Sequence, residues 1–140
     1  MRKESEHSVA SNTDSVDWSL YAILDEAWRR GRDIRELAEA AIRGGVTLMQ
    51  YRNKTDESGP FFEKAAVLTE ITKKWNIPLI INDRADIALA VHADGVHVGR
   101  QDLPVRTVRK LIGPDKLIGL SVSSPNELSA TESADYLGVG

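Results

Sequence analysis

The sequence predicts an α/β fold built on a parallel sheet, and three observations lead to this prediction. From Leu20 onward, short apolar segments alternate with longer amphipathic segments, which is the pattern of consecutive βα units. The apolar segments begin at residues 20, 46, 78, 95, 117 and 136, a steady repeat with no linker. Along most of these segments one side-chain parity is apolar and the other is small or polar. The pattern therefore indicates one continuous domain.

Six strands follow from this alternation. Their predicted ranges are Leu20–Asp25, Val46–Arg52, Pro78–Asn82, Gly95–Gly99, Leu117–Ser123 and Tyr136–Gly140. Five helices are predicted between and after them, and their start and stop signals are capping side chains, prolines and glycines. The helices are expected from Asp33 to Gly44-Gly45, from Pro60 to Trp75, after Asn82-Asp83, from Pro104 to Gly113, and from Ser124-Pro125.

The parity of the strands favours a barrel over an open doubly wound sheet. Strands covered by helices on both faces should be apolar on both parities. Here Ile118, Leu120 and Val122 alternate with Gly119, Ser121 and Ser123. Helices outside and a narrow polar interior explain this alternation, as in a TIM (β/α)8 barrel. Such a barrel takes about 200 residues or more. We therefore expect an incomplete barrel, with about six strands and five helices in this chain.

Composition narrows the class of protein. The 140 residues are 41% hydrophobic and 28% charged, which is ordinary for a soluble globular domain. The net charge of -3 gives no reason to expect nucleic acid or an anionic membrane as partner. No apolar run reaches the roughly 20 residues of a membrane helix. The absence of cysteine excludes disulfides, thiolate metal sites and a cysteine nucleophile.

The first 17 residues are mostly polar and carry Glu4, Glu6, Asp14 and Asp17. This stretch fits neither a secretory signal nor an acid-poor transit peptide. We predict a flexible cytoplasmic tail over residues 1–17, followed by the truncated barrel domain over residues 18–140. The edge of an incomplete barrel invites pairing, so a homo-oligomer is compatible with the sequence.

Three side chains of the second strand share one parity at its carboxyl end. Gln50, Arg52 and Lys54 bring an amide, a guanidinium and an ammonium to one side of the segment. The carboxyl ends of barrel strands form the active face, where two cations suit a phosphate or diphosphate. The alternative is a strand that simply runs out into solvated charges.

Two aspartates follow neighbouring strands and could hold a hard cation. Asp83 comes after the buried third strand, and Asp102 comes after the fourth. Each also has a structural reading, because Asp83 could cap the next helix together with Asp86, and Asp102 lies just before Pro104. We assign Asp86 to structure. Together with substrate phosphate oxygens, Asp83 and Asp102 would suit Mg²⁺ better than zinc.

Two further residues lie on the inward parity. His97 is expected to be a satisfied packing residue, since a lone interior histidine usually is. Ser121 has no histidine and aspartate arrangement evident around it, so we read it as a hydrogen-bond donor to a phosphate oxygen. The three tryptophans are dispersed and are expected to pack or to lie at the surface, and helical periodicity places Trp75 on the apolar face of the helix that begins at Pro60.

Several ordered motifs resemble one family, the thiamine phosphate synthases. The segments that carry the resemblance are Gly44–Lys54, Asn82–Ala90, Ala93–Pro104, Gly119–Ser123 and Ala134–Gly140. Agreement of several motifs in order, from about Leu20 to the last residue, is far more specific than any one of them.

The resemblance implies a (β/α)8 barrel that joins a hydroxymethylpyrimidine diphosphate to a thiazole phosphate, giving thiamine phosphate and diphosphate with magnesium. Departure of diphosphate would leave a pyrimidine-methyl cation that the thiazole nitrogen captures. Arg52, Lys54 and magnesium would stabilise the leaving group electrostatically, with no obligatory general base. The residues that match the family's pyrimidine diphosphate site are Gln50, Arg52, Lys54, Asn82 and Ser121, and those that match its magnesium site are Asp83 and Asp102.

Some positions depart from the family pattern. Asn53 stands where the family usually has glutamate, and Arg100-Gln101 replaces a glutamine and an acidic residue. The family's segments after strand six lie beyond Gly140, so we expect little turnover from these 140 residues alone. The alternatives are a thiazole tautomerase on the same barrel, which lacks the paired magnesium aspartates, and a non-catalytic phosphate-binding fragment.

Overall fold

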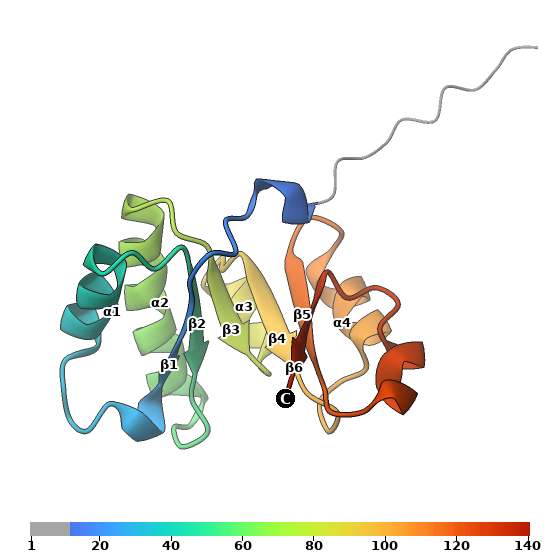
Figure 1. The fold of residues 1–140 in the computed structure, drawn as a ribbon. Coiled ribbons are helices and arrows are strands. Elements are labelled where there is room, and N and C mark those ends of the chain that lie inside the picture. Colours follow the sequence, from blue (N-terminus) through green and yellow to red (C-terminus); the bar gives the residue numbers. More distant parts are fainter. Residues whose placement is uncertain (1–11) are drawn as a thin grey trace, which may run out of the picture.

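The six predicted strands form a single curved sheet. The computed structural model describes the chain from Asn12 to Gly140, without the side chains of Asn12 and residues 128–130. All neighbouring strands are parallel and lie in chain order (Figure 1). The strands are β1 Tyr21–Asp25, β2 Leu48–Arg52, β3 Leu79–Asn82, β4 Gly95–Val98, β5 Leu117–Val122 and β6 Tyr136–Val139.

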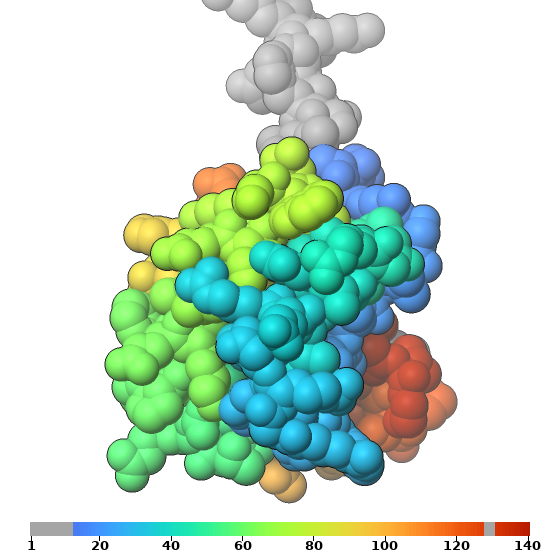
Figure 2. Space-filling view, turned by 90° about the vertical axis from the view of Figure 1, so that its left-hand side faces the viewer, coloured from blue at the N-terminus to red at the C-terminus, as the bar shows by residue number. Residues whose placement is uncertain are grey.

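Helices cover the convex face of this sheet. Figure 2 shows α1 and α2 side by side at the surface, and the same two helices contact each other. The helices are α1 Ile34–Arg43, α2 Ser58–Lys74, α3 Ala85–Ala90 and α4 Val105–Ile112, with short 3-10 helices η1 Asn12–Ser15, η2 Glu26–Trp28 and η3 Pro125–Ala130. The strands and helices thus form a parallel half-barrel with helices on its outside.

The predicted parity of the strands is confirmed. The outward side chains Val96, Val98, Ile118 and Leu120 are buried in one large core together with residues of the four α-helices. The inward positions are small or polar, except for Ile23 in β1 and a few residues near the amino ends of the strands. There, Leu48, Ile80 and Leu117 form a second small cluster, against which Val16 and Tyr21 pack.

Local signals place the helix ends as predicted, with two differences. Asp33 caps α1 by accepting hydrogen bonds from the backbone N–H groups of Arg35 and Glu36 at 2.7 and 3.2 Å. Trp75 was predicted on the core face of α2 but lies at its C-cap and is 46% exposed. The fifth predicted helix is a 3-10 helix, Pro125–Ala130. A single short 3-10 segment follows β5 because the chain returns within a few residues to β6.

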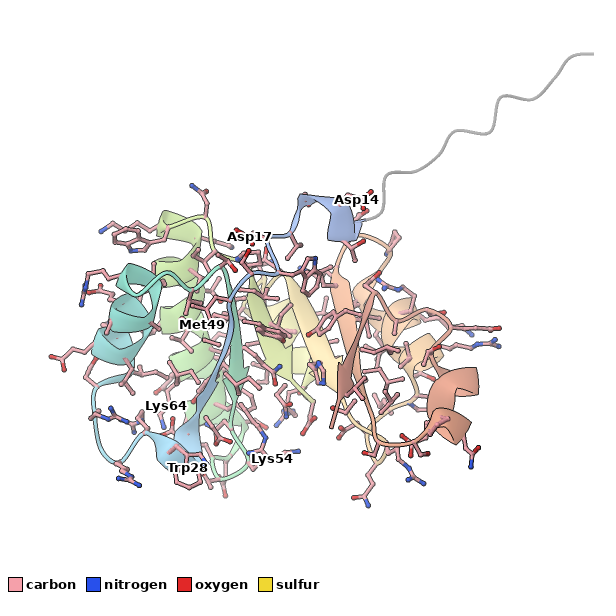
Figure 3. The ribbon with its side chains drawn as sticks, viewed as in Figure 1. Asp14, Asp17, Trp28, Met49, Lys54 and Lys64 are labelled. Carbon is pink, nitrogen blue, oxygen red and sulfur yellow. The ribbon has the colours of Figure 1, made fainter. Side chains whose placement is uncertain are left out.

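The segment before β1 is folded against the amino ends of the strands. Residues 1–11 lie outside the described part of the chain, but η1 and Val16 lie within the stretch predicted as a tail. The indole of Trp18 lies 5.0 Å from the ring of Tyr136, centroid to centroid. Figure 3 shows Asp14 and Asp17 at this end of the sheet and Lys54 at the other. The two ends of the half-barrel are therefore distinct, and the carboxyl end carries the predicted site.

Candidate functional site at the carboxyl edge of the sheet

The parallel strands bring six of the seven predicted site residues around one cavity. This cavity has a volume of about 400 Å³ and lies at the carboxyl ends of the strands. Its lining is Arg52, Lys54, Asn82, Asp83, His97, Gly99, Arg100, Gln101, Asp102 and Ser121. Gln50, the seventh, lines an adjoining cavity of about 540 Å³ in the concave interior. The two cavities share Arg52, Asn82, His97 and Ser121.

Each of the two predicted cations has a carboxylate partner. Arg52 Nη1 donates to Asp25 Oδ2 at 2.5 Å, and Lys54 Nζ donates to Asp83 Oδ2. The sequence interpretation missed Asp25. Its position at the carboxyl end of the predicted first strand is a signal that could have found it, and in the structure it lies directly opposite Arg52. Both cations are partly exposed, and each already has one carboxylate partner. An incoming anion would therefore compete with these carboxylates for Arg52 and Lys54.

Asp83 occupies an unusual backbone position. Its φ is 63°, in the left-handed region that aspartate tolerates better than most residues. Its N–H donates to the carbonyl of His97 at 2.7 Å, which ties the end of β3 to β4. The capping alternative is therefore wrong: Arg84 holds the N-cap position of α3, without a side-chain cap. Asp86 instead pairs with Arg84 at 2.6 Å, in agreement with its structural assignment.

Asp83 and Asp102 lie together across this cavity. Burial raises the pKa of Asp83, and the neighbouring Asp102 carboxyl raises it further, while Lys54 acts in the opposite direction. Asp102 is held in place by the N–H of Gly99, which donates to Oδ2 at 2.7 Å. Like charges placed side by side in a partly buried site are destabilising without a cation.

These two carboxylates fit a magnesium ion that takes its remaining ligands from a substrate. Within residues 12–140, no group of three or more histidine, cysteine, aspartate or glutamate side chains converges on a metal position. Mg²⁺ commonly takes one or two protein carboxylates and completes its octahedron with water and phosphate oxygens. The two carboxylates thus supply hard oxygen ligands for part of such a coordination sphere.

A chain of hydrogen bonds crosses the concave interior and ends at Ser121. Gln50 Nε2 donates to Tyr21 Oη at 2.7 Å, and Tyr21 Oη lies 2.7 Å from Tyr136 Oη. Tyr136 Oη lies 3.1 Å from His97 Nδ1, and His97 Nε2 lies 2.8 Å from Ser121 Oγ. We call these five side chains the interior chain. His97 is thus satisfied, as predicted, but the tyrosines were missed, although both lie on the inward parity.

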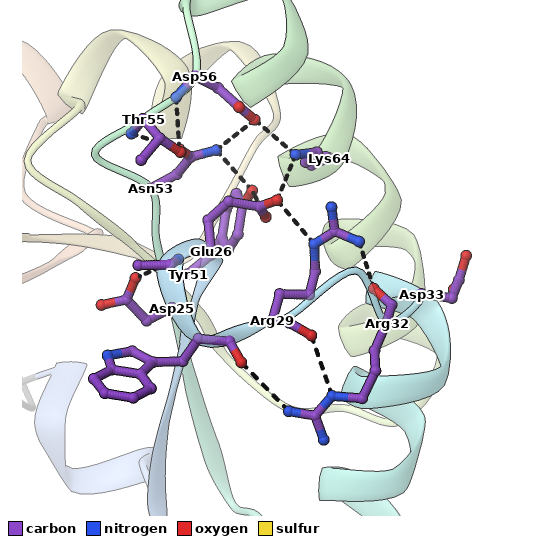
Figure 4. A network of polar contacts seen from close by, with 12 residues as sticks. Asp25, Glu26, Arg29, Arg32, Asp33, Tyr51, Asn53, Thr55, Asp56 and Lys64 are labelled. Atoms are coloured by element: carbon purple, nitrogen blue, oxygen red, sulfur yellow. Dashed lines mark hydrogen bonds and ion pairs between the residues drawn. The ribbon is translucent and has the colours of Figure 1, made fainter.

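Asn53 holds the turn that follows β2. Its side-chain carbonyl accepts from the N–H groups of Thr55 and Asp56 at 3.1 and 3.0 Å (Figure 4). Its amide nitrogen donates to Tyr51 Oη and to Asp56 Oδ2. Asn53 is 6% exposed, donates to the outward-facing Tyr51 and is not among the residues that line the cavity. This departure from the family pattern therefore concerns the turn between Arg52 and α2.

No helix in residues 12–140 is long and apolar enough to cross a membrane. The fold and the cavity define a parallel α/β half-barrel that gathers cationic, carboxylate and amide side chains at its carboxyl edge. Barrels of this class place their chemistry at that edge.

The chain belongs to the thiamine monophosphate synthase family, whose pattern matches residues 20–140. It is 52% identical over 127 residues to the thiamine-phosphate synthase of Caldanaerobacter subterraneus subsp. tengcongensis, covering 89% of this chain and 59% of the relative. It is 48% identical over 128 residues to that of Clostridium tetani, covering 90% and 61%.

A solved structure agrees with these relatives. Thiamine phosphate pyrophosphorylase from Pyrococcus furiosus superposes with a TM-score of 0.77 at 36% identity, over 86% of this chain and 59% of that structure. The chain thus spans about 60% of the length of the relatives it matches.

Proposed function

We propose that these residues form the diphosphate- and magnesium-binding part of a thiamine phosphate synthase. The reaction is the condensation of hydroxymethylpyrimidine diphosphate with thiazole phosphate, a transferase reaction that releases diphosphate. The observation that carries this proposal is the meeting of Arg52, Lys54, Asp83 and Asp102 around one cavity. A diphosphate brings several negative oxygens, and this set offers both direct cationic partners and a site for a bridging cation.

The polar side chains would divide the pyrimidine diphosphate between them. Arg52 would leave Asp25 and bind a pair of phosphate oxygens, which suits the planar fork of its guanidinium group. Lys54 would leave Asp83 and bind a phosphate oxygen through its ammonium group, which acts as a point charge. Ser121 and Asn82 would donate to remaining oxygens. Gln50, buried deeper in the concave interior, would meet the pyrimidine ring. Substrate binding would thus free Asp83 from Lys54 for the metal.

Asp83 and Asp102 would hold Mg²⁺, which when bound supplies positive charge that stabilises the leaving diphosphate. Arg52 and Lys54 would stabilise the same developing charge, because they contact oxygens on which electrons accumulate as the carbon–oxygen bond breaks. None of these residues needs to remove a proton from carbon. The two neighbouring aspartates also favour the synthase over the tautomerase alternative.

We propose that the acceptor part of the reaction needs segments that the longer relatives possess. We propose a closed eight-stranded barrel for a chain of their length, with the thiazole phosphate bound across the closed mouth. Turnover from the 140 residues alone is expected to be low. A cytoplasmic location, a homo-oligomer and the domain limits at residues 17 and 18 stay predictions.

Calorimetric titration with magnesium diphosphate tests the proposal on the chain itself. We expect saturable binding that disappears when EDTA removes the metal, and that the double variant Asp83→Ala, Asp102→Ala abolishes. Asp86→Ala is the matched control. The Asp86 side chain pairs with Arg84, is 66% exposed and lies outside the cavity. Metal-independent binding, or equal loss in the control, would contradict the assignment.

The condensation is tested in a chain extended to the length of the relatives. There, the double aspartate variant should lose magnesium-dependent thiamine phosphate formation, whereas Asp86→Ala should keep it. Undiminished synthesis by the double variant would overturn the metal assignment.

A further inference from the structure

The interior chain links the two ends of the proposed substrate site through groups that have no assigned role. It begins at Gln50, runs through Tyr21, Tyr136 and His97, and ends at Ser121, where the two cavities meet. Its members come from β2, β1, β6, β4 and β5 in that order. Five of the six strands therefore contribute to one continuous set of hydrogen bonds.

The backbone leaves space for the rings of Tyr136 and His97 in the interior chain. A Cβ added at Gly119 would overlap both the Tyr136 ring and Nδ1 of His97. A Cβ at Gly138 would lie 3.2 Å from Cε1 of His97. Trp18 packs against Tyr136 from the amino end of the half-barrel. Glycine at both strand positions thus permits the tyrosine and histidine to meet, and the indole limits movement of the tyrosine ring.

Counting hydrogens favours one direction for the hydrogen bonds of the interior chain. The amide nitrogen of Gln50 can only donate, so Tyr21 accepts from it and has one hydrogen to give. In the favoured direction that hydrogen goes to Tyr136, the other partner of Tyr21 in the interior chain. In the same direction Tyr136 donates its own hydrogen to Nδ1 of His97.

The consequence reaches Ser121. An imidazole whose Nδ1 accepts a hydrogen bond is neutral and carries one hydrogen. With Nδ1 accepting, that hydrogen is on Nε2 and is donated to Ser121 Oγ. The serine hydrogen is then available to an acceptor in the cavity. In the reverse direction the unused hydrogen would instead be that of Tyr21, inside the half-barrel.

We propose that Tyr136 is a positioning residue that, through His97, turns the hydroxyl hydrogen of Ser121 toward a bound diphosphate oxygen. The proposal rests on the proposed function for the identity of the ligand. The direction of the hydrogen bonds rests on the interior chain alone. Tyr136 contacts no reacting atom in this account, and its effect is to select one imidazole tautomer.

The tautomer is measured first, without any ligand. ¹⁵N-histidine labelling of the chain with His7 and His92 replaced by glutamine leaves only His97 signals. Long-range ¹H–¹⁵N spectra at pH 7.5 should show Nε2 protonated and Nδ1 unprotonated. Tyr136→Phe should shift the population toward the Nδ1-protonated form, because Nδ1 loses its donor. Tyr51→Phe, the same change at a buried tyrosine on the convex side, should leave the tautomer unchanged.

Affinity for magnesium diphosphate is measured second. Ser121→Ala should weaken binding about tenfold, since a hydrogen bond to a charged group is lost. Tyr136→Phe should weaken it several-fold. The double variant should bind no more weakly than Ser121→Ala, because both changes remove one contact. A purely structural role of Tyr136 would give additive losses and no change of tautomer.

An Nδ1-protonated imidazole in the unsubstituted chain would overturn the proposal, as would an unchanged tautomer in Tyr136→Phe. Additive losses would also overturn it. Absence of diphosphate binding by the unsubstituted chain would contradict the proposed function, while the tautomer would still decide the direction of the interior chain.

Discussion

Two clusters of the same residue types lie on opposite sides of β2. On the concave side, Arg52 and Lys54 pair with Asp25 and Asp83. On the convex side, Glu26 accepts from Lys64 Nζ at 2.7 Å, Arg29 Nε at 2.8 Å and Tyr51 Oη at 3.1 Å (Figure 4). Lys64 also donates to Asp56 at 2.7 Å. We call this convex cluster the outer brace.

The two clusters differ in exposure and in how completely their partners are satisfied. The side chains of Arg52 and Lys54 are 38% and 50% exposed, whereas Glu26 is 9% exposed. In the outer brace, each charge has several short hydrogen bonds within the protein. In the cavity, each cation has one carboxylate, and the two aspartates repel each other. Composition alone therefore does not separate a binding site from a structural network; exposure and unsatisfied bonding capacity do.

Breaking the outer brace should give the largest change in stability. Lys64→Met leaves Glu26 and Asp56 without their shared cation, and we expect the free energy of unfolding to fall by about 2–3 kcal/mol. Urea denaturation measures this change. Lys73→Met, at an exposed position on the same helix, is the control and should alter stability by less than about 0.5 kcal/mol. Equal effects of the two substitutions would remove the distinction between the clusters.

Breaking the cavity cluster should change binding and leave stability nearly intact. Arg52→Gln removes a charge-assisted fork, so the dissociation constant for magnesium diphosphate should rise about 10- to 100-fold. The free energy of unfolding should change by less than about 1 kcal/mol, because partly exposed ion pairs contribute little. Calorimetry and urea denaturation of the same preparation test both parts. A large loss of stability with unchanged affinity would reverse the roles of the clusters.

Acid should weaken the outer brace. Burial opposes the ionised form of Glu26, but hydrogen bonds from Lys64, Arg29 and Tyr51 prevail and hold its pKa below the ordinary value of 4.5. A carboxyl with a lowered folded pKa contributes stability that is present above the unfolded pKa and is lost as pH falls through the folded pKa. Stability should therefore decline below about pH 4.5, and Glu26→Gln should flatten this decline by about 1 kcal/mol.

The smallest effect should come from relieving the repulsion in the cavity. Asp102→Asn keeps the acceptor for the Gly99 N–H but removes the charge beside Asp83. Without metal, we expect the free energy of unfolding to stay equal or to rise by up to about 1 kcal/mol. Thermal unfolding with EDTA measures this difference. A marked loss of stability would show that Asp102 is primarily structural.

Local sequence patterns predicted the strands and most helices of the fold correctly. Alternation along the strands gave their number and inward parity, and Asp33 and Gly44-Gly45 gave the ends of α1, because these signals act over a few residues. Trp75 was misplaced, since helical periodicity continued past the point where α2 ends. The register between strands is a tertiary property, and for this reason Asp25 and Tyr136, whose partners lie 27 and 39 residues away, were missed.

Strand order equals chain order in this sheet, which bears on how the site arises during synthesis. Each strand emerging from the ribosome can pair with the one before it, without waiting for a distant segment. Arg52 and Lys54 emerge before Asp83, Asp102 and Ser121. Arg52 can meet its partner Asp25 as soon as β2 pairs with β1, whereas Lys54 has to wait for Asp83, and the pocket becomes complete only when β5 docks. Translational pausing between β2 and β3 would therefore expose an unfinished edge at which Lys54 lacks its carboxylate partner.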